Sequence, residues 1–173
     1  MLSAWHEFYG LLGTAAAALL ALLFVAASIG ASVLTTHRAG PTRTYLSPVV
    51  FHYCNILFLS LIALIPDLEA NVFGVIIVLA AAGSLVYSLY ILQRLFRDGI
   101  ADLADRFAYG TVPVISYSAG LIAGCRILAG HDRGSLYVIG GASLLLLVVN
   151  VRNAWDLMLA LARRATEQQQ SKS

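Results

Sequence analysis

Charged side chains are scarce in this sequence of 173 residues. Only 12% of the residues are Asp, Glu, Lys or Arg, whereas 60% are hydrophobic, and the mean hydropathy is +0.82. Soluble domains have about 25% charged and roughly 45–50% apolar residues. The scarcity of charge therefore excludes a soluble enzyme and predicts a membrane protein.

Sequence motifs for catalysis and for nucleotide binding are also missing. The chain contains no GxGxxG, Walker, GxSxG, HExxH or CxxC motif, and no carboxylate lies within its long uncharged runs. Nucleotide binding, hydrolysis, redox relay and proton-coupled transport therefore lack the residues that they need. Because no basic stripe is present, nucleic acid is not an expected partner either. We expect no catalytic residues, no metal site and no cofactor.

Five long apolar runs make up most of the chain. A helix needs about 20 apolar residues to cross the roughly 30 Å of hydrocarbon in a bilayer, and each run is long enough. The sequence therefore predicts an all-α integral membrane bundle of five transmembrane helices, in a single domain at residues 1–164, with a polar tail at 165–173. The expected spans are residues 8–36, 46–66, 70–93, 109–129 and 135–161.

An additional amphipathic helix is expected between the third and fourth spans. Phe96, Ile100, Leu103 and Phe107 are three or four residues apart, so they share one face of a helix, with charged residues on the opposite face. This pattern predicts an interfacial helix at about residues 94–108, lying on the membrane surface as a connector or as a docking surface for a partner.

The distribution of basic residues predicts the orientation. Five spans place the loops alternately on two sides, and Lys and Arg favour the cytoplasmic side. We therefore expect the N-terminus outside and the C-terminus in the cytoplasm, and the ten arginines and one lysine are typical of a bacterial inner-membrane protein. Only Arg126 and Arg133 fall on the outer side, and the other nine fall on the inner side: Arg38, Arg43, Arg94, Arg97, Arg106, Arg152, Arg163, Arg164 and Lys172.

The second span is the most polar. Tyr45, His52 and Asn55 project within about 80 degrees of one another, and Ser60 follows further along the span. An ionisable residue inside a membrane suggests a functional site, so this face is a candidate lining for a water-filled path. The alternative is a neutral histidine that hydrogen-bonds a neighbouring helix, with Ser84, Tyr87 and Ser88 as candidate partners.

Small residues recur at four-residue spacing in the first and fourth spans. Such spacing lets two helix backbones approach closely in lipid. The stripes pack either within one chain or between chains, and the sequence is compatible with both. The residues concerned are Gly13, Ala17 and Ala21 in the first span and Ser116, Gly120 and Gly124 in the fourth.

Polar residues also gather where the fifth span reaches the cytoplasmic side. Arg152 and Asp156 are four apart and can pair, whereas Asn150 and Asn153 can hydrogen-bond across helices, and Trp155 suits the membrane interface. We expect an interface anchor with a polar network as its second role.

The chain resembles an uncharacterised family of small bacterial multi-span inner-membrane proteins. The resemblance covers most of the chain, and some members of that family are labelled modulators of a membrane-bound protease. It implies no catalytic or binding residues. The motifs that carry it are Trp5-His6-Glu7-Phe8-Tyr9, Gly13 to Ala18, Leu22-Leu23-Phe24-Val25, Ser60-Leu61, Leu64-Ile65-Pro66 and Arg152-Asn153-Ala154-Trp155-Asp156-Leu157.

These patterns favour a non-enzymatic membrane protein that works by assembly. Its partners are then the lipid bilayer together with a second copy, or it is an accessory subunit of another membrane complex. One alternative is a homo-oligomeric channel lined by the polar face of the second span. Another is a haem or metal protein that uses His6 and His131, which fall on the same side of the membrane.

Overall fold

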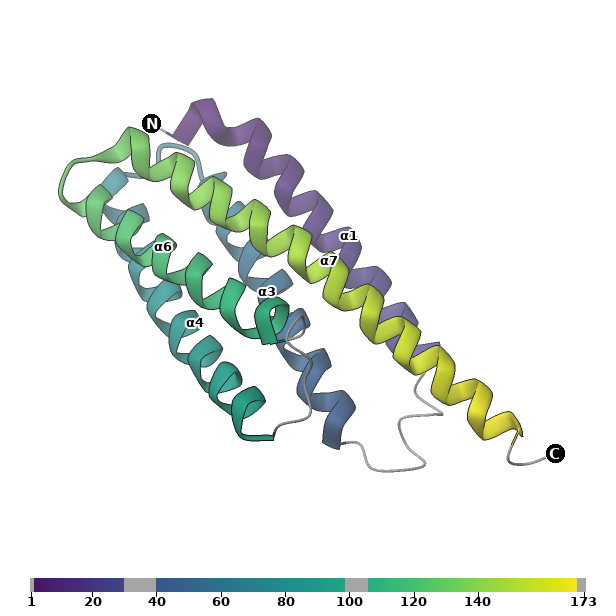
Figure 1. Cartoon of the computed structure of the whole chain (residues 1–173). Helices are drawn as coiled ribbons and strands as arrows, with labels where there is room; N and C mark the ends of the chain where they lie inside the picture. The colour runs from purple at the N-terminus through teal and green to yellow at the C-terminus, as the bar shows by residue number, and fades with distance from the viewer. Residues whose placement is uncertain (1, 30–39, 99–105, 171–173) are drawn as a thin grey trace.

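The computed structural model describes residues 2–29, 40–98 and 106–170 (Figure 1). Within these ranges every secondary-structure element is a helix, as the sequence predicts, and turns at 64–69 and 129–131 join successive helices. The elements in order are η1 (Leu2–Trp5), α1 (His6–Ile29), α3 (Gly40–Ala63), α4 (Ala70–Asp98), the π-helix η2 (Arg106–Thr111), α6 (Val112–Leu128) and α7 (Asp132–Gln170).

Four of these helices are long and apolar enough to cross a membrane. They contain the stretches Leu2–Ser28, Ala70–Arg97, Ala108–Leu128 and Gly134–Leu159. The apolar part of α3 is shorter and runs from Ser47 to Ala63. By length and composition, these four helices are compatible with a multi-pass helical membrane protein.

Successive helices run in alternate directions and pack side by side (Figure 1). The most extensive contacts join α4 to α6, α1 to α3 and α6 to α7, and α3 also packs on α7. The helices α3, α7, α6 and α4 thus form a ring in which α4 and α3 meet only weakly. α1 lies outside this ring, mainly against α3.

The helix ends follow local sequence signals. α3 begins at Gly40, with Pro41 in its first turn, where a missing amide N–H does no harm. It ends at Ala63, because Pro66 disfavours helical backbone in the residue before it. α6 ends in a glycine cap: Gly130 adopts a φ of 81°, and the amide of His131 donates to the Arg126 carbonyl at 2.8 Å.

The structure differs from the expected element bounds in two places. Residues 94–98, where the interfacial helix was expected to begin, continue α4, and residues 106–111 form the π-helix η2. The middle of that expected helix, at 99–105, lies outside the described residues. In the expected polar tail, residues 165–170 continue α7. A charged residue ends an apolar run in the sequence, but it does not end a helix. The backbone hydrogen bonds of a helix also form where the helix extends from the apolar region into water.

Glycines mark the closest approaches between helices. A Cβ at Gly13 would lie 2.9 Å from the Ser60 Cβ, and a Cβ at Gly74 would lie 2.9 Å from Leu128 Cδ2. At Gly140 it would lie 3.1 Å from the Trp5 ring. A larger residue at Gly13 would strike the Ser60 Cβ, which moves only with its helix, whereas at Gly74 and Gly140 the neighbouring side chains would have to shift. Small residues therefore allow the close packing of the bundle.

Candidate functional site

His52 lies in the middle of the bundle and bonds to α6. Its side chain is 2% exposed, and its Nδ1 atom lies 2.8 Å from the Tyr117 hydroxyl, within hydrogen-bonding distance. The sequence analysis offered a hydrogen bond from His52 to a neighbouring helix as one alternative, and the structure contains such a bond, but its partner is Tyr117 of α6 and not one of the α4 residues named as candidates. Phe51, the neighbour of His52, stacks on Tyr87 of α4 with a centroid distance of 4.3 Å.

Asn55 lies one turn further along α3 and bonds to α4. The Ser84 hydroxyl donates to Asn55 Oδ1 at 2.9 Å, and Asn55 Nδ2 donates to the Phe51 carbonyl at 3.0 Å. The pair of Ser84 and Asn55 and the pair of His52 and Tyr117 are joined through α3, where His52 and Asn55 are three residues apart. His52, Asn55, Ser84 and Tyr117 therefore form one connected group, the central polar cluster, with members from three helices.

The other two residues of the predicted polar face behave differently. Ser60 is fully buried and faces Gly13 of α1 rather than the central polar cluster. Tyr45 belongs to α3, but its side chain lies outside the described residues. The residues of the predicted polar face therefore contact different helices. Ser60 is eight residues, or more than two turns, beyond His52, so it lies at a different level of α3.

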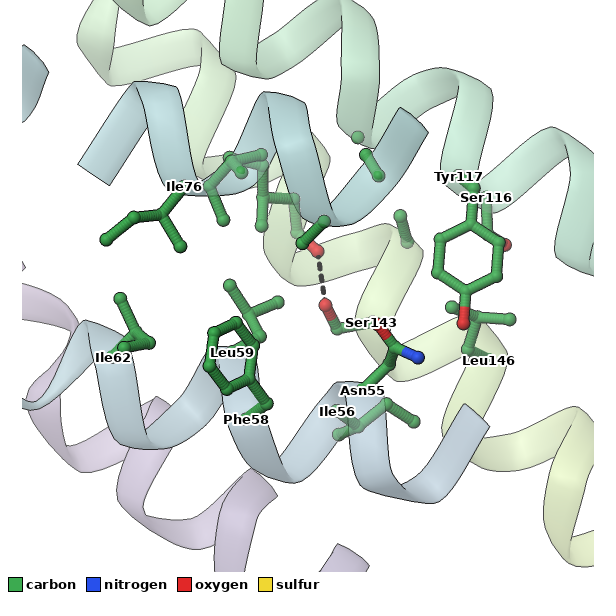
Figure 2. Close-up of a pocket in the computed structure, with 16 residues that line it drawn as sticks. Asn55, Ile56, Phe58, Leu59, Ile62, Ile76, Ser116, Tyr117, Ser143 and Leu146 are labelled. Carbon is green, nitrogen blue, oxygen red and sulfur yellow. Dashed lines mark hydrogen bonds between the residues drawn. The ribbon is translucent and has the colours of Figure 1, made fainter. Parts of the chain in front are cut away.

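A cavity lies next to the central polar cluster (Figure 2). Its volume is about 60 Å³, and its sixteen lining residues come from α3, α4, α6 and α7. Asn55 and Tyr117 belong both to the lining and to the central polar cluster. The cavity combines apolar walls with a few converging polar groups, which is the usual composition of a small-molecule site. It is the candidate functional site of the chain.

The small residues of the two predicted stripes do not all serve the same contacts. A Cβ at Gly124 would lie 3.0 Å from Cγ2 of both Ile77 and Val78, so this glycine packs on α4. Gly120 and Ser116 face the cavity, and Gly13 packs on α3. In contrast, Ala17 and Ala21 of α1 are exposed.

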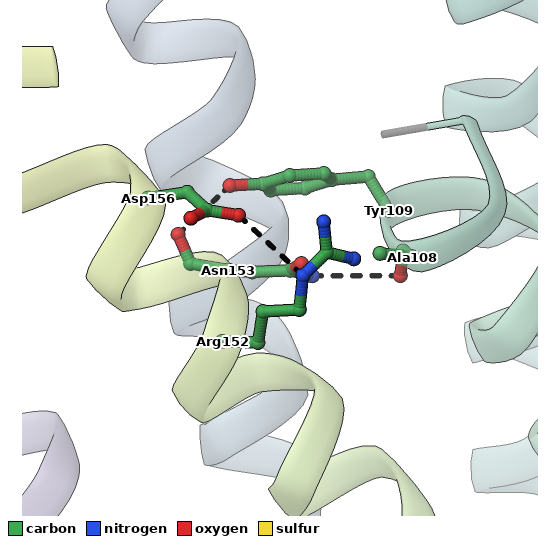
Figure 3. A network of polar contacts seen from close by, with 5 residues as sticks. All are labelled: Ala108, Tyr109, Arg152, Asn153 and Asp156. Carbon is green, nitrogen blue, oxygen red and sulfur yellow. Dashed lines mark hydrogen bonds and ion pairs between the residues drawn. The ribbon is translucent and has the colours of Figure 1, made fainter. Parts of the chain in front are cut away.

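A second polar network joins α7 to the π-helix (Figure 3). The Tyr109 hydroxyl donates to the Asn153 carbonyl at 2.8 Å, and Asn153 Nδ2 donates to the Ala108 carbonyl at 3.4 Å. The predicted pair of Arg152 and Asp156 is present, with 3.7 Å between Nε and Oδ2. The sequence thus indicated a cross-helix role for Asn153 correctly.

The remaining members of this predicted network have local roles. Asn150 donates to the Leu146 carbonyl of its own helix at 2.8 Å instead of bonding to a neighbouring helix. Trp155 is 65% exposed, as expected for an interface anchor. The π-turn itself was not expected, since no sequence pattern distinguishes it from an ordinary helical turn.

Tyr117 is the site residue that sequence reasoning missed. A tyrosine normally lies near the end of a span, where its hydroxyl reaches the headgroups. Tyr117 instead lies well inside the apolar stretch Ala108–Leu128, and its side chain is 7% exposed. A tyrosine at that depth needs a polar partner, so its position is a usable signal for a buried polar contact.

Comparisons with protein families, with curated proteins and with solved structures find no match for this chain. In the part of the chain that the structure describes, no group of three or more His, Cys, Asp or Glu residues is placed to hold a metal ion. Both cysteines, Cys54 and Cys125, are free. The features that bear on function are therefore the cavity, the two polar networks and the exposed surface.

Proposed function

We propose that this chain is a five-span protein of the bacterial inner membrane that acts without catalysis, by assembling through α1 with another transmembrane helix. That helix belongs either to a second copy of the chain or to a membrane complex in which this chain is an accessory subunit. The resemblance in the sequence makes a membrane-bound protease the first complex to examine.

The packing of α3 supports a fifth crossing. Its 24 residues correspond to about 36 Å at 1.5 Å per residue, which exceeds the roughly 30 Å of hydrocarbon. It runs antiparallel to α1 and α4 and contacts α1, α4 and α7. A helix that packs in this way against membrane-spanning helices is expected to lie in the bilayer with them.

The arginines support the proposed orientation. Arg94 and Arg97 end α4, and Arg152 lies beside the start of the π-helix, at the end of the bundle away from the N-terminus (Figure 1). Arg126 lies at the opposite end, just before the turn after α6. The cytoplasmic side is then the end that carries Arg94, Arg97 and Arg152. A reporter fused to Ser173 tests the orientation, because it should be active only in the cytoplasm.

The exposed face of α1 is the observation that carries the proposal. At 100 degrees per residue, five small residues fall within an arc of about 100 degrees, and Val25, one turn beyond Ala21, falls in the same arc. The five small residues are exposed or, at Gly10, half-buried: Gly10, Thr14, Ala17, Ala18 and Ala21. The buried side of α1 lies opposite and carries Tyr9, Leu12, Ala16 and Leu23.

Elsewhere in the bundle most exposed positions carry large side chains, and exposed small residues such as Gly83 and Gly141 stand alone. Leu79 and Val86 of α4 are each 69% exposed, and Ile122 of α6 and Val148 of α7 are about 60% exposed. Large side chains fill the space next to lipid, whereas small ones favour the close approach of another backbone. The small-residue arc of α1 is therefore a surface suited to a second helix.

Cysteine cross-linking in membranes tests this assignment. Cys54 and Cys125 are first replaced by alanine, and single cysteines are then introduced as Ala17→Cys or Ala21→Cys. The matched controls are Leu11→Cys and Leu22→Cys, which are exposed just beyond the edge of the arc, about 80–140 degrees around α1 from positions 17 and 21. Cross-links at 17 and 21 but not at 11 and 22 are expected. Equal yields at all four positions would contradict a specific interface on α1.

The channel alternative draws no support from the contacts of α3. His52 and Asn55 are hydrogen-bonded to α6 and α4 of the same chain, and Ser60 is buried against α1. A path at an oligomer axis needs these groups on the outer surface of the protomer.

A further inference from the structure

The cavity lies where two consecutive helices scarcely touch. A short turn at residues 64–69 joins α3 to α4, yet these helices share far fewer contacts than α4 shares with α6 or α3 with α1. Residues of α6 and α7, including Gly120 and Ile139, line the back of the gap. At its front lies Phe58, which is 47% exposed. The gap is therefore a slot that a molecule dissolved in the bilayer can enter from the side.

The residues that line this slot are apolar at one end and more polar at the other (Figure 2). One end is apolar, with Phe58, Leu59, Ile62 and Ile76. Polar groups gather at the other end, where Asn55, Ser116, Tyr117 and Ser143 lie. Because Asn55 is the middle residue of the apolar stretch Ser47–Ala63, the polar end lies near the centre of the bilayer.

Two polar groups of the lining have unused hydrogen-bonding capacity. The Ser116 hydroxyl is buried and has no partner among the described residues. Asn55 Nδ2 uses one N–H for the Phe51 carbonyl and has a second N–H left. Ser143 and Tyr117 already bond to the Ile139 carbonyl and to His52. Unpaired donors are unfavourable where water is excluded, so these two groups favour a ligand with an acceptor oxygen.

The lining also restricts the charge of the ligand. None of the sixteen lining residues is charged. A carboxylate or phosphate at this depth would have no cationic partner in the lining, and an unpaired charge inside a membrane is strongly unfavourable. The ligand oxygen therefore belongs to a neutral group.

We propose that the slot between α3 and α4 binds a single-chain neutral lipid that carries a hydroxyl or carbonyl oxygen. The oxygen lies at Asn55 and Ser116, and the hydrocarbon follows Leu59 and Ile62. The enclosed space of about 60 Å³ is smaller than the roughly 150 Å³ that hold benzene in an engineered protein cavity, so only the oxygen-bearing end is enclosed. The site does not depend on assembly through α1.

Photolabelling of the full-length protein tests the proposal. The probe is hexadecanol with a diazirine in its chain, added to protein in nanodiscs of phosphatidylcholine and phosphatidylglycerol. Labelled peptides are identified by mass spectrometry, and unlabelled hexadecanol, hexadecan-2-one, hexadecane and hexadecanoate serve as competitors. Labelling of α3 and α4 peptides that line the slot is expected. The alcohol and the ketone should compete about 2- to 10-fold better than the alkane, the range expected for one hydrogen bond.

Two glycine variants distinguish the slot from the general lipid surface. A Cβ at Gly120 would meet only the Ala81 Cβ, at 3.8 Å, so Gly120→Leu fills the cavity without striking backbone. Gly83→Leu is the matched control, since Gly83 is exposed on α4 with nothing within 4 Å of a Cβ. Labelling should fall at least severalfold in the first variant and stay unchanged in the second.

Two polar variants test the role of the oxygen. Ser116→Ala removes a hydroxyl that has no partner, and Asn55→Leu removes the amide. Loss of the preference for alcohol over alkane in either variant supports the proposal. Equal competition by hexadecane and hexadecanol in the unmodified protein, or a preference that survives in both variants, would overturn it. Stronger competition by hexadecanoate would overturn the requirement for a neutral group.

Discussion

α1 and α6 carry the same kind of small-residue stripe but use it differently. In α6 the stripe of Ser116, Gly120 and Gly124 faces inward, where it packs on α4 and lines the cavity. In α1 only Gly13 packs on a neighbouring helix, whereas Ala17 and Ala21 are exposed. Small residues four apart therefore indicate the close approach of another helix, but they do not identify which helix it is.

The largest effect is expected where the stripe is buried. Gly124→Leu should destabilise the fold by about 3 kcal/mol or more, because any side chain at this position meets α4 and overpacking is unfavourable. A Cβ there would lie 3.2 Å from the backbone nitrogen of Val78, which cannot move independently of its helix.

The free energy of unfolding, measured by titration with a denaturing detergent, tests this expectation. Gly83→Leu is the control, because it adds the same side chain on the exposed face of α4 and should change the stability by no more than about 0.5 kcal/mol. If Gly124→Leu were as stable as the control, α6 would not pack on α4 as described.

Loss of the His52 hydrogen bond should have an intermediate effect. Tyr117→Phe keeps the ring but removes the hydroxyl that lies 2.8 Å from His52 Nδ1. Hydrogen bonds between membrane helices contribute about 0.6 kcal/mol on average and up to roughly 1.7, so a loss of about 1 kcal/mol is expected. Tyr137→Phe is the control, since that side chain is 71% exposed. Equal stability of both variants would mean that the central polar cluster does not hold α3 to α6.

A smaller effect is expected at the second polar network, between α7 and the π-helix. Tyr109→Phe removes the hydrogen bond to the Asn153 carbonyl and should reduce stability by roughly 0.6 kcal/mol. Its effect should be local, because the hydrogen bond fastens the π-helix to α7. Amide hydrogen exchange should therefore become faster at residues 106–111 and stay unchanged in α1. Faster exchange throughout the bundle would show that the network supports the whole fold.

The smallest effect on stability is expected at the exposed stripe. Ala17→Leu combined with Ala21→Leu should change the free energy of unfolding by no more than about 0.5 kcal/mol, because neither side chain packs inside the chain. The same double variant should lose assembly, since leucines at these positions prevent close approach. A large loss of stability in the isolated chain would show that these alanines serve the fold instead.

The long apolar helices were predictable because hydrocarbon thickness dictates the length of a span. Hydropathy indicated the helical class and the approximate position of α4, which begins at Ala70 as expected. It did not indicate that residues 94–98 continue α4. Amphipathic spacing shows which face of a helix is apolar, but it does not show whether the helix continues the preceding span or lies along the membrane surface. For the same reason it could not distinguish the π-helix from an α-helix.

The candidate site was only partly predictable. His52 and Asn55 share a face in any helix, so the sequence marked them as polar groups in need of partners. Their partners depend on which helix packs against that face, and Tyr117 and Ser84 come from two different helices. The cavity depends on the weak contact between α3 and α4. This contact is set by the packing of the whole bundle, so no short sequence pattern predicts it.

The most direct test of assembly through α1 is the mass of the protein extracted in a mild detergent and examined by native mass spectrometry. We expect a mass above that of the 18.5 kDa chain for the unmodified protein and for Gly83→Leu. For the variant with Ala17→Leu and Ala21→Leu we expect the mass of a single chain. A single-chain mass for the unmodified protein, or an assembly that survives in the double variant, would contradict assembly through α1.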